Sequence, residues 1–198
     1  RLLNPKPGGN VLDLTAAPGG KATYAAIRMR NKGRVTAVDK SHQRLELVVD
    51  NAQRLGIRII SPVASDLADF VAEPFDRVLL DPPCSGWGTA GKHADLRWAK
   101  SSQDIENLTK IQTKMIDRAA RFVKPGGVLV YSTCTIMRRE NDQIVEEFLL
   151  RNPHFEIDSA AQFYGPDLVN DRGFVKTYPD CDGLDGAFCA RLKRKLEG

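Results

Sequence analysis

Two cysteines stand at the ends of two apolar segments of the sequence. Cys84 lies in Asp81–Thr89, "DPPCSGWGT", and Cys134 lies in Tyr131–Asn141, "YSTCTIMRREN". Each cysteine follows a short apolar run that predicts a buried strand. A thiolate adds readily to a polarised ring carbon, and a nearby acid such as Asp81 can assist the addition. Because a single cysteine at a strand end is more often a small buried hydrophobe, the interpretation depends on the pair.

Methylation at carbon 5 of cytosine is a reaction that requires such a thiol. That carbon is too weak a nucleophile to take a methyl group directly. Addition of a thiolate to ring carbon 6, with a proton supplied at ring nitrogen 3, makes carbon 5 enamine-like and reactive. The carbon 5 proton must then leave and the thiolate is eliminated, so a second group has to assist product release. The two cysteines and Asp81 fit these requirements, and their types alone leave open which cysteine has which role.

A glycine turn precedes both cysteines in the sequence, within Asp13–Lys21, "DLTAAPGGK". Pro18, Gly19 and Gly20 predict a tight turn with exposed backbone N–H groups, which a ligand can approach without meeting a Cβ atom. The turn lacks the G-x-G-x-x-G spacing of a dinucleotide-binding fold, so the sequence disfavours pyrophosphate binding.

Acidic residues follow the next three predicted strands. Asp39 comes about 20 residues after the turn, where a carboxylate can hold ribose hydroxyls. Asp66 is placed to face an adenine edge, and Asp81 precedes the first cysteine. Any one of these aspartates is as often a turn former. Together at one sheet edge, they suit a nucleoside that carries no phosphate, such as S-adenosyl-L-methionine.

Short apolar runs alternate with longer amphipathic segments along the chain. The predicted strands are 11–14, 34–38, 57–63, 75–80, 128–132, 155–157 and 187–192, and the predicted helices are 19–29, 41–55, 105–122 and 140–150. This alternation predicts an α/β fold with a mostly parallel, doubly wound sheet of seven strands. The pattern of 187–192 is typical of an antiparallel edge strand. Ligands of such sheets lie at the carboxyl ends of the strands, where both cysteines fall.

The bulk composition sets broad limits on function. The 198 residues, 42% hydrophobic and 27% charged, suffice for one well-buried core. No apolar run approaches the roughly 18 residues that a membrane span needs. No C-x-x-C pair or His-x-x-x-His spacing predicts a metal site, and without a visible secretory signal we expect reduced thiols and a cytoplasmic protein. The net charge of +4 permits a polyanionic partner, and no pattern indicates an oligomeric state.

Five segments, taken in order, resemble the successive motifs of the Sun/nucleolar-protein family of RNA cytosine-5 methyltransferases. They are "LDLTAAPGGKAT", "VDKSHQRL", "SDL", "DPPCSGWGT" and "STCTIMRREN", with "GKHADLRW" and "DGAFCARLKR" as further similar segments. The likeness runs from Val11 to Arg194 and is strongest to the bacterial 16S ribosomal RNA methyltransferase B (Sun/Fmu) type. It implies a Rossmann-like class I methyltransferase fold, S-adenosyl-L-methionine as cofactor, and ribosomal RNA as partner.

The resemblance also implies a role for each matching residue. Cys134 of the Thr-Cys motif is the nucleophile, Cys84 of the Pro-Cys motif assists product release, and Asp81 contacts and protonates the cytosine. The implied cofactor-binding residues are Thr15, Ala16, Ala17, Pro18, Gly19, Gly20, Lys21, Asp39, Asp66 and Asp81, with Lys21 as a charge partner in that site. Thr15 departs from the family, which usually has cysteine there; it affects the cofactor wall and not the chemistry.

Residues 1–198 are therefore expected to form a methyltransferase catalytic domain. Because the chain begins without methionine and is only modestly basic, we expect it to be part of a longer protein with an upstream RNA-binding domain. Three alternatives stay compatible with the sequence. A tRNA cytosine-5 methyltransferase would share every motif, and a non-catalytic RNA-binding module would share the fold. A methyltransferase of exocyclic amines usually has an aromatic residue after Asp-Pro-Pro, where this chain has Cys84, and it would leave Cys134 without a role.

Overall fold

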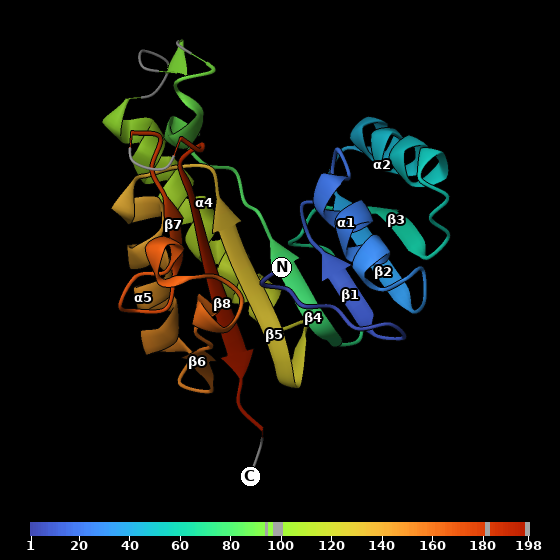
Figure 1. The fold of residues 1–198 in the computed structure, drawn as a ribbon. Coiled ribbons are helices and arrows are strands. Elements are labelled where there is room, and N and C mark those ends of the chain that lie inside the picture. The colour runs from blue at the N-terminus through green and yellow to red at the C-terminus, as the bar shows by residue number, and fades with distance from the viewer. Residues whose placement is uncertain (94, 97–100, 181–182, 197–198) are drawn as a thin grey trace.

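The computed structural model describes residues 1–93, 95–96, 101–180 and 183–196, which fold around one mixed β-sheet (Figure 1). The strands are β1 (Asn10–Asp13), β2 (Arg34–Asp39), β3 (Ile60–Ala64), β4 (Phe75–Leu80), β5 (Val123–Thr133), β6 (Phe155–Ile157), β7 (Val175–Thr177) and β8 (Ala187–Arg194). The α-helices are α1 (Gly20–Arg28), α2 (His42–Arg54), α4 (Ser102–Ala120) and α5 (Asp142–Arg151). The sheet order is β3-β2-β1-β4-β5-β8-β6, and β7 also pairs with β8.

Strands β1 to β5 run parallel, so their carboxyl ends meet at one edge of the sheet. The β8 arrow in Figure 1 points the opposite way to β5, with which it pairs in antiparallel register. From β1 the chain first moves outward through β2 and β3, and it then returns to β4 on the other side of β1. A sheet with such a switch of direction binds its ligands in the crevice at the carboxyl ends.

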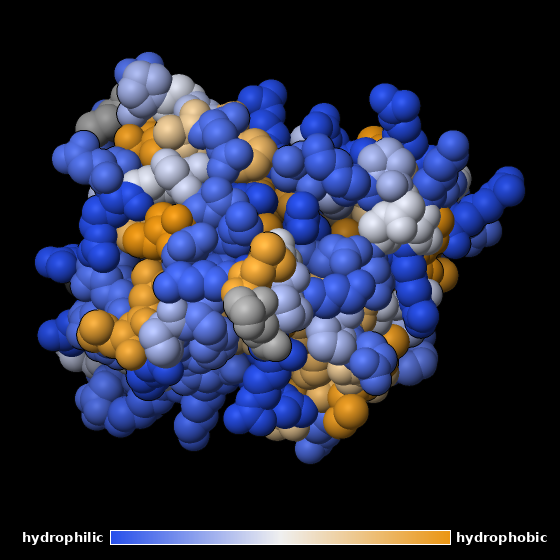
Figure 2. Space-filling view, turned by 90° about the horizontal axis from the view of Figure 1, so that it is seen from below, coloured by the Kyte–Doolittle hydropathy of each residue, from blue (hydrophilic) through white to orange (hydrophobic). Residues whose placement is uncertain are grey.

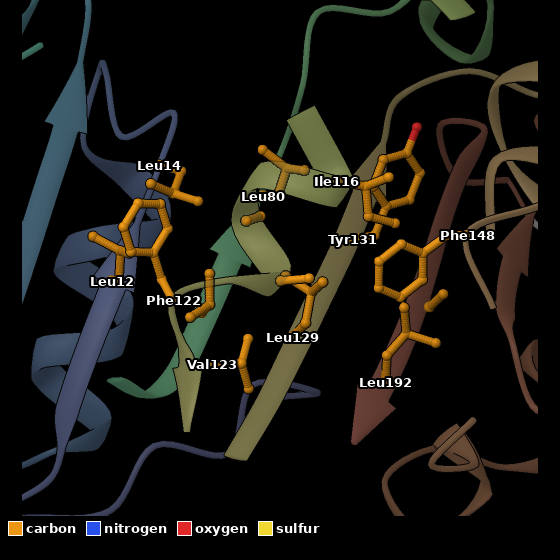
Figure 3. Packing of buried hydrophobic residues seen from close by; sticks show 14 of the residues in the cluster. Leu12, Leu14, Leu80, Ile116, Phe122, Val123, Leu129, Tyr131, Phe148 and Leu192 are labelled. Carbon is orange, nitrogen blue, oxygen red and sulfur yellow. The ribbon is translucent and has the colours of Figure 1, made fainter. Parts of the chain in front are cut away.

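Helices cover both faces of the sheet because successive residues of a strand point to opposite sides. Val78 and Leu80 of β4 belong to the apolar cluster that contains α4 and α5, whereas Leu79 belongs to the cluster that contains α1 and α2. Leu129 and Val130 of β5 divide between the two clusters in the same way. Figure 3 shows the first cluster, in which Leu80 of β4 and Leu129 of β5 lie with Ile116 of α4. The doubly wound α/β class predicted from the sequence is therefore confirmed.

Hydrogen bonds within the sequence fix the starts of two helices. The Ser41 side chain accepts the Arg44 N–H at 3.2 Å, so Ser41 is the N-cap of α2. Ser101 and Asp104 form a reciprocal capping box at the start of α4. Because α2 starts this close to the end of β2, Asp39 and the first turn of the helix lie side by side.

Two details of the predicted sheet are wrong. Strand β8 is antiparallel but does not lie at the edge, because β7 pairs with 187–189 and β6 pairs with 192–194 on its outer side. Strand β7 has only three residues, too few for a period to be read from the sequence. The strand predicted at 128–132 begins earlier than expected, since α4 ends at Ala120 and β5 already begins at Val123.

Figure 2 views the molecule from the side opposite to the carboxyl ends of the parallel strands. Hydrophilic side chains cover most of this face, with hydrophobic side chains in small separate groups. None of the helices in the described ranges has the length and apolar character needed to cross a membrane.

The two-sided core predicts the effect of truncating a residue of β5. Leu129 is fully buried at 0% exposure, so we expect Leu129→Ala to lower the free energy of unfolding. The expected loss is about 2–5 kcal/mol in urea denaturation. Leu150→Ala is the matched control, because Leu150 is 84% exposed. It should change stability by less than about 0.5 kcal/mol. Equal losses in the two variants would contradict this placement of the core.

Candidate active site

A cavity of about 550 Å³ opens at the carboxyl edge of the sheet. Thr15, Ala17, Asp39 and Asp66 line it on the side of β1, β2 and β3. On the other side, Asp81, Cys84 and Cys134 line it from the loops after β4 and β5, and Met115 closes it from α4. The structure thus brings the predicted cofactor loop and both predicted catalytic cysteines to one space.

The cavity does not contact every residue of the predicted cofactor set. Among the described residues, five of that set line it, namely Thr15, Ala17, Asp39, Asp66 and Asp81. Gly20 and Lys21 instead line a neighbouring hollow of about 310 Å³ between α1 and the sheet. Ala16 and Gly19 are buried in the turn, and Pro18 is exposed. Ala16, Pro18 and Gly19 therefore shape the loop that carries Thr15 and Ala17.

The loop between β1 and α1 is held from two directions. Gly19 has a φ of +108°, and a Cβ atom there would lie 3.1 Å from the Val48 Cα of α2, so this position requires glycine. The Asp39 carboxylate accepts the N–H groups of Ala17 at 3.3 Å and Ser41 at 3.0 Å. In addition, the Arg44 guanidinium donates to the Ala17 carbonyl at 2.9 Å. Asp39 therefore orients the turn and also faces the cavity.

Thr15 connects this loop to the one that carries Cys84. Its hydroxyl oxygen accepts the Asp81 N–H at 3.0 Å, across the point where the strand order reverses between β1 and β4. A hydroxyl is a stronger acceptor than the thiol that the family usually has at this position. The substitution therefore adds a link between the two loops, which sequence analysis did not anticipate.

Asp13 is a buried acid of the site that sequence reasoning missed. Burial raises the pKa of Asp13 to about 7, although the Thr15 N–H and the Lys21 ammonium act in the opposite direction. Its Oδ1 accepts that N–H at 3.3 Å, and its Oδ2 has no hydrogen-bond partner among the described residues. A buried carboxyl oxygen without a partner favours the protonated form or a polar ligand beside it.

The two catalytic candidates are in direct contact. Their sulfur atoms lie 3.3 Å apart, with Cys134 exposed and Cys84 half-buried. The hydrogen bond from Cys84 lowers the pKa of Cys134 to about 7, against the effects of burial and of the Asp81 charge. The same contact, together with burial, raises the pKa of Cys84 well above its usual range. At neutral pH, Cys134 is therefore substantially a thiolate, and Cys84 is the thiol that donates to it.

Asp81 forms an ion pair with Lys21 beside the sulfur pair. Burial lowers the pKa of Lys21, but the Asp81 carboxylate raises it by more, so the ammonium form is stabilised. Lys21, the predicted charge partner, is therefore next to the site. Its ammonium contacts Asp81, which lines the cavity, but Lys21 itself does not line it.

The loops that carry the cysteines are linked below the sulfur atoms. The Gly88 N–H donates to the Cys134 carbonyl at 3.0 Å. A Cβ atom at residue 88 would lie 1.9 Å from the Gly186 carbonyl oxygen, so only glycine fits between the loops. Deeper in the protein, the Ser85 N–H and hydroxyl both donate to the buried Glu140 carboxylate. Sequence reasoning missed these residues, because no local pattern marks them.

Cys189, the other cysteine that the structure describes, does not line the cavity of about 550 Å³. Burial raises the pKa of Cys189, in β8, to about 11, so this residue stays a thiol at neutral pH. Cys181 and part of the Gly91–Trp98 segment lie outside the described residues.

Solved structures with the same fold define the class of the protein. One is NSun6 from Pyrococcus horikoshii with SFG, which has a TM-score of 0.87 and 34% identity over 100% of this chain and 50% of that chain. Another is a methyltransferase homolog protein from Pyrococcus horikoshii, with a TM-score of 0.82 and 33% identity over 97% of this chain and 63% of that chain. The fold is therefore a Rossmann-like methyltransferase fold.

The chain matches the family described as 16S rRNA methyltransferase RsmB/F over residues 1–193, and it belongs to that family. It is 38% identical to the probable ribosomal RNA small subunit methyltransferase B of Bacillus subtilis, over 98% of this chain and 45% of the relative. It is 36% identical to the ribosomal RNA small subunit methyltransferase B of Klebsiella pneumoniae, over 98% of this chain and 44% of the relative. The chain thus spans less than half the length of these relatives. The family predicted from the sequence motifs is confirmed.

The sulfur contact predicts how Cys134 responds to pH. Alkylation by iodoacetamide requires the thiolate, so the rate at Cys134 should rise with pH around a midpoint of about 7. Cys84→Ala removes the donor, and the midpoint should move up towards about 8.5. At pH 7 the thiolate fraction then falls from about one half to about 3%, and labelling slows roughly 15-fold. Peptide mass spectrometry measures the labelling of Cys134 specifically.

A matched control is Cys189→Ala, which removes a thiol that does not contact Cys134. This variant should keep the midpoint near 7. An unchanged midpoint in Cys84→Ala would mean that the Cys84 thiol does not stabilise the Cys134 thiolate.

Proposed function

We propose that the protein methylates carbon 5 of a cytosine in 16S ribosomal RNA, with S-adenosyl-L-methionine as methyl donor and a covalent adduct to Cys134. The observation that carries the proposal is the pair of sulfur atoms, 3.3 Å apart, at the wall of the cavity that also contains Asp39 and Thr15. The family description and the names of the relatives in Bacillus subtilis and Klebsiella pneumoniae support the ribosomal substrate.

The cavity has the residues that a nucleoside donor needs. Asp39 at the end of β2 is buried, faces the cavity and is oriented by two backbone N–H groups, which suits it to accept ribose hydroxyls. Leu67 and Met115 give the cavity apolar walls against which a purine can pack. The carboxyl groups of Asp39, Asp66 and Asp81 line the cavity and favour a donor with a positive sulfonium centre and no phosphate. When bound, S-adenosyl-L-methionine supplies an electrophilic methyl group.

The first step is addition to the base. The Cys134 thiolate gives its electron pair to ring carbon 6 of the cytosine, and the electrons of the carbon 5–carbon 6 double bond move towards ring nitrogen 3. Asp81 takes up a proton from solvent and gives it to nitrogen 3, and the Lys21 ammonium stabilises the Asp81 carboxylate that results, through the ion pair between them. Carbon 5 is then a nucleophile and can take the methyl group.

The second step is release of the product. Once the adduct has formed, the Cys84 thiol gives its own proton to solvent. The Cys84 thiolate then removes the proton of carbon 5, and the carbon 5–carbon 6 double bond forms again as the bond from carbon 6 to the Cys134 sulfur breaks. The sulfur keeps the electron pair of that bond, and the proton on nitrogen 3 returns to Asp81. The cytosine has then exchanged one proton for one methyl group, and both cysteines can begin another cycle.

The RNA must present an unstacked base to this site. Ring carbon 6 is inaccessible within a helix, so the target cytidine has to be unpaired or flipped out, which costs a few kcal/mol. Arg138 and Arg139 follow Cys134 by four and five positions and are exposed, where they can contact the phosphates of the strand. Because the relatives are about twice as long as this chain, we expect an RNA-binding region outside it to share in recognition.

Replacement of Cys134 tests the covalent step. Cys134→Ala should reduce methyl transfer to 16S ribosomal RNA by at least about 10⁴-fold, because the raised pKa of the other thiol described in the site, Cys84, keeps it protonated. Calorimetric titration with S-adenosyl-L-methionine should give the same affinity for this variant as for the unaltered protein. Normal turnover in Cys134→Ala would contradict the covalent mechanism and favour methylation of an exocyclic amine.

RNA that contains 5-fluorocytosine tests both the adduct and the substrate. Fluorine at carbon 5 cannot leave as a proton does, so the Cys134 adduct should persist and migrate as a protein–RNA complex on denaturing gels. The adduct should form with 16S ribosomal RNA, while transfer RNA with the same substitution serves as the competitor. Trapping only with transfer RNA would move the proposal to that substrate. No trapping with either RNA, in a protein that binds the methyl donor, would indicate an RNA-binding module.

A further inference from the structure

Glu140 is a buried acid that no step of the proposed reaction uses. Its side chain is 0% exposed, and three donors satisfy its carboxylate. Oε1 accepts the Ser85 N–H at 2.8 Å and the Gln112 amide N–H at 2.9 Å, and Oε2 accepts the Ser85 hydroxyl at 2.5 Å. Because burial of a carboxylate is costly, a fully buried one with three donors requires an explanation beyond the packing of the core.

The donors of Glu140 come from the two segments that surround the site. Ser85 directly follows Cys84, and Gln112 of α4 also donates to the Pro83 carbonyl at 2.8 Å. The Glu140 carboxylate therefore holds the backbone on both sides of Cys84. It accepts the Ser85 N–H directly, and it contacts the Pro83 carbonyl through the Gln112 amide. A main-chain group of Glu140 is fixed as well, since its carbonyl accepts the Tyr131 hydroxyl at 2.7 Å.

A second path of hydrogen bonds ties the same network to Cys134. Thr135 directly follows Cys134, and its hydroxyl lies 2.8 Å from the Ser85 hydroxyl. Since the Ser85 hydroxyl donates to Glu140, Thr135 is the donor in this contact, and its oxygen accepts the Met137 N–H at 3.2 Å. This hydrogen bond thus joins Ser85, which follows Cys84, to Thr135, which follows Cys134, and Ser85 in turn contacts Glu140.

We infer that Glu140 is a positioning residue that holds the Cys84 thiol at hydrogen-bonding distance from the Cys134 sulfur. It contacts neither the cavity nor the sulfur atoms, and it acts through Ser85 and Thr135. The inference goes beyond the proposed function, because it concerns what sets the state of the nucleophile, and it rests on the proposed role of Cys134 only for its effect on catalysis.

The other charged groups near Cys134 do not depend on this network. Lys21 and Asp81 approach the sulfur from α1 and from the end of β4, and their ion pair does not contact Glu140. Arg138 and Arg139 of the Glu140 segment are exposed. A change at Glu140 should therefore affect Cys134 through Cys84 and not through these charges.

Glu140→Gln tests the inference, because it keeps the shape of the side chain and replaces an acceptor oxygen by a donor N–H. One of the three donors then faces another donor, so the Cys84 segment should shift. The readout is the rate of Cys134 alkylation by iodoacetamide against pH, which needs neither RNA nor methyl donor. We expect the midpoint to rise by about one pH unit, which slows labelling at pH 7 by about 5- to 10-fold. Affinity for S-adenosyl-L-methionine should stay unchanged, since Glu140 does not line the cavity.

Glu73→Gln is the matched control, with the same chemical change at an exposed glutamate between β3 and β4. It should leave the midpoint where it is. A role confined to fold stability would lower the melting temperature of Glu140→Gln and leave the midpoint of the folded protein unchanged, which would overturn the inference.

A second variant keeps the inference testable if Glu140→Gln does not fold. Thr135→Val has nearly the same volume and lacks the hydroxyl that donates to Ser85, so it should raise the midpoint by a smaller amount in the same direction. A folded Thr135→Val protein with the midpoint of the unaltered protein would overturn the inference. Because alkylation is measured without RNA, either result is independent of the trapping experiment on the reaction itself.

Discussion

The contact between the Cys84 and Cys134 sulfur atoms is the interaction on which the site depends. At 3.3 Å, a thiol and a thiolate share one proton after the first proton of the pair has left. The two cysteines therefore titrate as a pair and not as independent groups. The shared proton stabilises a thiolate at the exposed cysteine and keeps the half-buried cysteine protonated. A separation larger by 1 or 2 Å would remove the hydrogen bond, so the pKa of Cys134 would rise and the pKa of Cys84 would fall, although burial would still raise the latter.

The topology of the sheet makes this contact available. Strands β4 and β5 are parallel neighbours, so the loops that follow them leave the same edge side by side. Strand β1 lies on the other side of β4, and the Thr15 hydroxyl bonds the Asp81 N–H across the gap between their ends. The cofactor loop and the cysteines therefore come together where the strand order reverses, which is the general position of ligand sites in open α/β sheets.

The sequence predicted those parts of the site that follow from local patterns. Apolar runs placed Cys84, Cys134 and Asp39 at strand ends, and parallel strands then required them to share an edge. The sequence could not predict the link between Ser85 and Glu140, which lie 55 positions apart, because a glutamate in a polar segment has the pattern of a solvated residue. The position of β8 was missed for a related reason. Its alternation describes which side chains are buried, and it contains no information about which strands bond to its outer side.

The same sulfur contact would meet the opposite proton requirements of the two halves of the proposed reaction. Addition to the base needs Cys134 as a thiolate, and the Cys84 hydrogen bond provides this state. Once the Cys134 sulfur is bonded to carbon, it carries no negative charge and is a weak acceptor. The largest cause of the raised pKa of Cys84 is its hydrogen bond to that sulfur, so this pKa must fall when the adduct forms. In the proposed reaction, Cys84 can then lose its proton to solvent and accept the proton of carbon 5. In this proposal one thiol is thus a donor before the adduct forms and a base after it.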